Sequence, residues 1–147
     1  MKTDRYTLES ESCLTAFEFI SEGKNGPIHK LIRFQKINEQ GLYNLAFGEK
    51  NADGGINDLA VSNNGDREKV LATVGSALYK FFDRFPNAFV YAEGSTASRT
   101  RLYRMGITKF YKEIIADFHL FGIIGEELYE FEIGKEYDGF LVLRKFN

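Results

Sequence analysis

An apolar stripe within residues 67–85 is the feature that most restricts the fold of this chain. In the segment REKVLATVGSALYKFFDRF, apolar residues recur every three or four positions: Val70, Val74, Leu78, Phe81 and Phe85. This spacing matches one face of an α-helix. Asp66 precedes the segment as a candidate N-cap, and Pro86 follows it, which predicts that the helix ends there. Such a helix needs a second apolar layer to cover its stripe.

The residues before this helix have the pattern of β-strands. Apolar and polar residues alternate in short segments that are separated by turn residues, as in NGP at 25–27, and a period of two is typical of strands with one buried face. We expect a short strand at 5–10 and further strands at 13–23, 28–37, 42–50 and 58–63. The first four predict an antiparallel meander.

A second alternation of strand and helix follows Pro86. Residues 87–94 are apolar on both alternations, which predicts a central strand covered on both faces. The step from 58–63 through the first helix to this strand has the length of a crossover between parallel strands. A second helix is expected from Thr96 to about Asp117, with a break at Gly106 as the alternative. Residues 118–146 then predict two or three more antiparallel strands.

This order predicts an α+β fold: one mostly antiparallel, twisted sheet with two main helices. The chain has 147 residues, which fits a single α+β domain over 1–147. Fourteen Phe and eight Tyr make the apolar content aromatic, which favours sheet surfaces packed against helices.

Composition and motifs exclude several classes of function. The net charge of −2 argues against general nucleic-acid binding. No secretory signal and no apolar run long enough for a membrane span is visible, and Cys13 is the single cysteine, so we expect a soluble, cytoplasmic protein. Neither His29 nor His119 has partners at metal-ligand spacing, and the loop around Asp53 lacks the ligand order of a calcium site. We therefore expect no metal site, and no motif identifies a cofactor.

The stretch FVYAEGSTASRTRLYRMG, residues 89–106, carries the strongest candidate site. A strand is expected to become a helix here, and a helix N-terminus offers unpaired N–H groups and a partial positive charge. Arginines in the first turn are unfavourable beside that charge, and a bound anion would remove the conflict. The candidate ligand-binding residues are Gly94, Ser95, Thr96, Ser98, Arg99, Arg101 and Tyr103.

The arginines of this stretch are expected to differ in role. Arg99 precedes Leu102 and Tyr103 by three and four positions, so it shares their sheet-facing stripe and is the arginine expected in a pocket. Arg101 and Arg104 are expected on another face. A purely structural interpretation stays open, in which Ser95 or Thr96 is an ordinary cap and Arg99 pairs with an internal carboxylate.

Two resemblances bear on function. The run GSTASRTRLYRMGI, the closing YDGFLVLRK and the overall length resemble an uncharacterised family of small bacterial proteins, which implies a bacterial cytosolic protein. The order of the segments DLAVSN, VGSALYKFF, FVYAEG and ASRTRLYRMGI is similar to the core of acetyl-CoA-dependent N-acetyltransferases. That resemblance implies pyrophosphate at the first helix and Tyr103 as general acid. Asp66 and Glu68 stand where the backbone amides of that family meet phosphate, so it is a resemblance of topology.

Three functions follow as hypotheses. The first is a binding or regulatory domain that takes a small anionic ligand at residues 94–101. The second is a degenerate acyltransferase-like enzyme that uses the same helix end, with Tyr103 or a histidine in proton transfer. The third is an interaction module that contacts a protein partner through an aromatic sheet face. The sequence identifies neither a substrate nor a cofactor.

Overall fold

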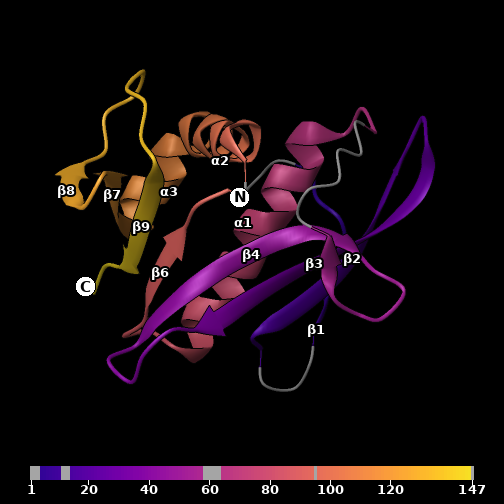
Figure 1. Ribbon diagram of the computed structural model, residues 1–147, viewed down its shortest axis with the longest axis horizontal. Helices are drawn as coiled ribbons and strands as arrows, with labels where there is room; N and C mark the ends of the chain where they lie inside the picture. The colour runs from indigo at the N-terminus through magenta and orange to yellow at the C-terminus, as the bar shows by residue number, and fades with distance from the viewer. Residues whose placement is uncertain (1–3, 11–13, 58–63, 95, 147) are drawn as a thin grey trace.

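The computed structural model describes residues 4–10, 14–57, 64–94 and 96–146. Its helices are α1 (Arg67–Arg84), α2 (Ala97–Lys109) and α3 (Tyr111–Asp117). Its strands are β1 (Glu9–Ser10), β2 (Ala16–Gly23), β3 (Gly26–Lys36), β4 (Leu42–Lys50), β5 (Ile56–Asn57), β6 (Phe89–Ala92), β7 (Phe118–Ile124), β8 (Glu127–Glu130) and β9 (Gly139–Arg144) (Figure 1). The strand expected at 58–63 lies outside the described residues.

The strands form one open, mixed sheet in the order β1-β2-β3-β4-β6-β9-β7-β8, with β5 paired to β4. Every neighbouring pair is antiparallel except β4 and β6, which are parallel. Parallel neighbours need a long connection, and here α1 lies within it. The expected α+β class with a mostly antiparallel sheet is confirmed, and the parallel partner of β6 is β4.

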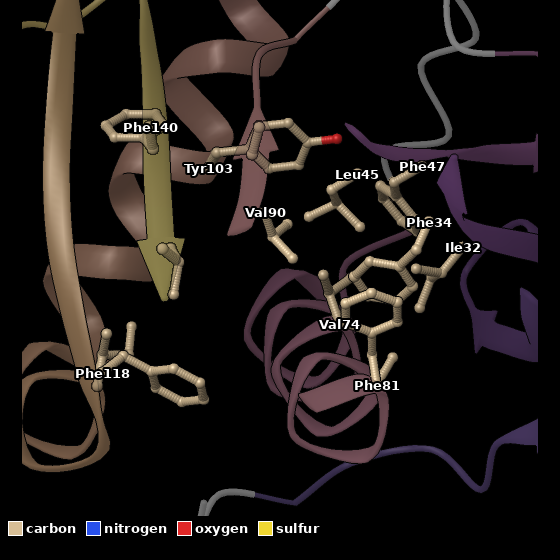
Figure 2. Close-up of a cluster of buried hydrophobic side chains, with 14 of the residues drawn as sticks. Ile32, Phe34, Leu45, Phe47, Val74, Phe81, Val90, Tyr103, Phe118 and Phe140 are labelled. Atoms are coloured by element: carbon tan, nitrogen blue, oxygen red, sulfur yellow. The ribbon is translucent and has the colours of Figure 1, made fainter. Parts of the chain in front are cut away.

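Aromatic side chains join α1 to the sheet. The Phe81 ring stacks on Phe34 of β3 with 4.2 Å between centroids, and Phe82 lies 5.2 Å from Phe118 of β7. Figure 2 shows Phe34, Phe81 and Phe118, together with Leu45 and Val90, directed into one apolar layer between helix and strands. The stripe predicted for α1 is therefore the inner face of the helix, the face that packs against the sheet.

The helices cover one face of the sheet and leave the other open. On β6, Val90 is 1% exposed and faces the helices, whereas Phe89 is 38% exposed. The register sets Phe89 beside Leu143 and Tyr91 beside Leu141 of β9 on this open face. The expectation that residues 87–94 are covered on both faces is wrong, because α1 crosses behind β3 and β4 on the same side as the other helices (Figure 1).

The second helical segment is interrupted. Phe110 adopts φ −104° and ψ 21° between α2 and α3, so the expectation of one continuous helix to Asp117 is wrong. The break is not at Gly106, because α2 continues through it to Lys109. The glycine there lets α1 approach closely: a Cβ at 106 would lie 2.9 Å from Leu71 Cδ2. The interruption at Phe110 redirects the chain into α3, which leads straight into β7.

No helix in the described parts of the chain has the length and apolar character needed to cross a membrane.

Candidate functional site

A cleft of about 790 Å³ lies at the end of the sheet where β6 leads into α2. One side is formed by the first two turns of α2, and the other by the end of β7 and by the residues just before β9. Figure 1 shows α2 beside the loop that leads into β9. Residues from two distant parts of the sequence, 91–104 and 123–138, therefore share this cleft.

The start of α2 is fixed by local hydrogen bonds. Thr96 is the N-cap, and its Oγ1 accepts from the backbone N–H of Arg99 at 3.1 Å. The N–H of Gly94 donates to Thr100 Oγ1 at 3.0 Å, and a Cβ on Gly94 would lie 2.3 Å from the backbone nitrogen of Thr100. The predicted cap is confirmed at Thr96, and Gly94 allows the strand end to lie against the helix.

Two arginines form the basic wall of the cleft. Arg101 and Arg104 both line it, three positions apart on one face of α2. Arg104 Nη1 lies 3.9 Å from Glu136 Oε1. Arg101 is exposed, and no hydrogen bond or ion pair joins it to another residue of the described ranges. The expectation that Arg104 is turned away from the pocket is wrong.

Arg99 points elsewhere. Its Nη1 donates to the Phe47 carbonyl oxygen at 2.8 Å, and its guanidinium lies 5.4 Å from the centroid of the Phe47 ring. Arg101 follows Arg99 by two positions, which is about 200° of helix rotation, so the two side chains leave α2 on opposite sides. Arg99 thus anchors α2 to β4 and does not line the cleft.

The remaining candidates divide in the same way. Gly94 and Thr96 line the cleft together with Arg101, whereas exposed Ser98 does not. Tyr103 is only 7% exposed, and Figure 2 shows its hydroxyl directed toward β4, where Leu45 lies. Ser95 lies outside the described residues.

Carboxylates from both segments, 91–104 and 123–138, form an acidic wall of the cleft. Glu93, Glu136 and Asp138 line it. The Tyr91 hydroxyl donates to Glu93 Oε2, and the N–H of Gly125 donates to Asp138 Oδ2 at 2.7 Å. Burial and the neighbouring Glu93 and Asp138 carboxylates raise the pKa of Tyr91 to about 12. These carboxylates therefore attract a positively charged group and repel a further negative group.

Sequence analysis missed this second wall. Tyr137 is held there because its ring lies against Gly122, where a Cβ would be 2.2 Å from Tyr137 Cδ1. Its hydroxyl also accepts from the N–H of Glu132 at 3.0 Å. The sequence carries one relevant signal, the glycine at 122 within a strand, which leaves room for a side chain of the turn before β9. No local pattern shows that this turn lies opposite residues 94–104.

The raised pKa of Tyr91 gives a pH-dependent prediction. Because its pKa is higher in the folded protein than the ordinary value of 10, Tyr91 contributes stability that is fully present below pH 10 and is lost as pH rises toward about 12. We expect the tyrosinate absorbance of the wild type minus that of Tyr91→Phe to show a titration near pH 12. A difference titration centred near pH 10 would contradict the described environment.

Across 4–10, 14–57, 64–94 and 96–146, no group of three or more His, Cys, Asp and Glu side chains is arranged to hold a metal ion.

Comparison with known proteins places the chain in a family. The model of a family of unknown function, DUF6934, matches residues 2–145, which is nearly the whole chain. No curated protein and no solved structure matches the sequence. The resemblance to an uncharacterised family of small proteins of about this length is thereby confirmed, whereas the resemblance to N-acetyltransferases has no support from a match. The cleft between α2 and β7 is thus the candidate site of a protein that belongs to the DUF6934 family.

Proposed function

We propose that this protein is a binding or regulatory domain that takes a small anionic ligand in the cleft beside α2. The observation that carries the proposal is the basic wall: two guanidinium groups on one helix face line a cleft of about 790 Å³. Arg101 is exposed there and makes no ion pair with the other described residues. A phosphate or carboxylate group is the natural partner, because guanidinium binds both through two parallel hydrogen bonds.

Further groups beside Arg101 would bind the same anionic group of the ligand. Thr96, Ala97 and Thr100 line the cleft at the first turn of α2. The N-terminus of this 13-residue helix carries partial positive charge, and it has no acidic residue in its first turn to offset that charge. An anion at Arg101 would therefore be attracted by the arginine side chains and by the helix end together.

The acyltransferase hypothesis is less well supported. Asp66 occupies the N-cap position of α1, where that mechanism needs room for pyrophosphate, and its Oδ2 accepts from the hydroxyls of Tyr6 and Ser21. A carboxylate held there repels a phosphate. Tyr103, the matching general acid, is buried and does not line the cleft.

The hypothesis of a protein partner rests on the open face of the sheet. Phe89 is exposed on that face, yet Tyr91, Leu141 and Leu143 are half-buried there. Isolated exposed apolar side chains are common on protein surfaces. No observation indicates which protein would cover this face, so we favour the cleft.

A thermal-shift experiment with Arg101→Gln tests the proposal. The panel contains inorganic phosphate, nucleotides, coenzyme A, sugar phosphates and carboxylates. An anion at about 100 times its dissociation constant adds about 2.7 kcal/mol of stability, which corresponds to a rise in Tm of roughly 5–10 °C. We expect Arg101→Gln to weaken such binding by about tenfold, because it removes a charge-assisted hydrogen bond.

The matched control is Arg67→Gln, which removes an exposed arginine of α1 that does not line the cleft. This variant should bind as tightly as the wild type. The proposal fails if no anion of the panel raises the Tm, or if both variants lose binding equally.

A further inference from the structure

The two walls of the cleft have opposite hydrogen-bonding character. Arg101 and Arg104 offer only donors on the α2 side. The lining also holds three carboxylates, so it carries more negative than positive charge. Arg104 and Glu136 lie within 3.9 Å of each other and partly compensate. Arg101 on α2 and the carboxylates of Glu93 and Asp138 on the acidic wall then remain outside that pair.

The side chains of Tyr91, Glu93, Glu136 and Asp138 have no donor left for an anion. The single hydroxyl proton of Tyr91 is donated to Glu93 Oε2, and ionised carboxylates only accept. The hydrogen bonds from Tyr91 and Gly125 engage Oε2 of Glu93 and Oδ2 of Asp138, so neither bond uses the second oxygens, Glu93 Oε1 and Asp138 Oδ1. With the Tyr91 hydroxyl oxygen, they add three acceptor atoms to those of the Glu136 carboxylate.

Gly139 leaves room for the Tyr91 ring of this wall. The Tyr91 hydroxyl oxygen lies 3.1 Å from the position that a Cβ on Gly139 would occupy. A side chain at 139 would therefore press on the phenol ring and its bond to Glu93. The cleft is thus shaped to present acceptors on this side.

We propose that the ligand is dipolar: a small molecule that carries a phosphate or carboxylate at one end and an ammonium group at the other. This inference rests on the proposed function, since its anionic end is the one bound at Arg101. The ammonium group donates to Glu93 and Asp138, and the anion accepts from Arg101 and the first turn of α2. A ligand with an anion alone would leave the acceptors of the acidic wall without a donor and would meet their negative charge.

Matched ligand pairs test this inference by calorimetric titration. The phosphate pair is O-phosphoethanolamine and monoethyl phosphate, and the carboxylate pair is γ-aminobutyrate and butyrate. Each pair differs in whether an ammonium group is present. We expect the amine-bearing member of at least one pair to bind about tenfold more tightly, the effect of one charge-assisted hydrogen bond.

Glu93→Gln is the decisive variant, because it removes one of the three carboxylate charges of the acidic wall with little change of shape. It should weaken binding of the amine-bearing member about tenfold and leave binding of the simple anion equal or tighter. Glu126→Gln is the matched control: Glu126 is exposed in the turn after Gly125 and does not line the cleft. It should change neither affinity.

The outcomes separate the two proposals. Equal affinities within both pairs, or an equal loss for both members in Glu93→Gln, would overturn the dipolar ligand and leave the anion site standing. If no phosphate or carboxylate binds, or if Arg101→Gln has no effect on binding, the anion site and the dipolar ligand fail together.

Discussion

Phe81→Ala should lower the free energy of unfolding by about 3–5 kcal/mol, the usual cost of removing a large ring from a packed core. The Phe81 side chain is fully buried, and its ring contacts four others, those of Phe34, Tyr43, Phe82 and Phe85. Alanine would leave a cavity between α1 and β3 that these neighbours cannot fill. Urea unfolding followed by circular dichroism measures the change.

Phe146→Ala is the control for this variant. Phe146 is 68% exposed, so the same change of residue type should alter stability by no more than about 0.5 kcal/mol. A loss below about 1 kcal/mol in Phe81→Ala would contradict the central position of this ring, because even partial collapse of such a site costs more.

Gly94→Ala should have the second largest effect, a destabilisation of about 1–3 kcal/mol with loss of ligand binding. The new Cβ would lie 2.3 Å from the backbone nitrogen of Thr100 and 2.5 Å from the backbone carbon of Arg99. Backbone atoms of a helix cannot rotate away as a side chain can. The first turn of α2 would have to move away from the end of β6, and the cleft would change shape with it.

Gly55→Ala is the matched control for Gly94→Ala. Its added Cβ would lie 3.2 Å from Asp53 Oδ1, the end of a flexible side chain. Thermal unfolding together with the anion titration should show little change for Gly55→Ala and a loss of both stability and binding for Gly94→Ala. If Gly94→Ala kept wild-type stability, the close approach between strand end and helix would be wrong.

Sequence periodicity was sufficient for most of the fold. The stripe of α1 was readable because Val70, Val74 and Phe81 face a single layer, and β4 begins and ends at the residues expected from its alternation. The wrong predictions concern features that depend on contacts between residues distant in the sequence. An apolar pattern at 87–94 could not show that all helices lie on one face, and the continuous stripe from 102 to 114 hid the interruption at Phe110.

The same reasoning from sequence spacing predicted only part of the candidate site. Helical spacing correctly separated Arg99 from Arg101 and Arg104, but it could not show which side of α2 faces the cleft. That side is set by Glu136 and Asp138, which are more than thirty residues away in the sequence. A sequence pattern describes one element at a time, whereas this cleft exists only where two elements meet.

The place of β9 in the sheet has a consequence for the order of folding during translation. β9 follows every other described strand in the sequence, yet it lies between β6 and β7. Until the ribosome releases residues 139–144, β6 and β7 each keep a bare edge with free backbone donors and acceptors. Such edges pair readily with foreign chains. The nascent protein therefore stays vulnerable to aggregation until the segment 139–144 inserts between its neighbours.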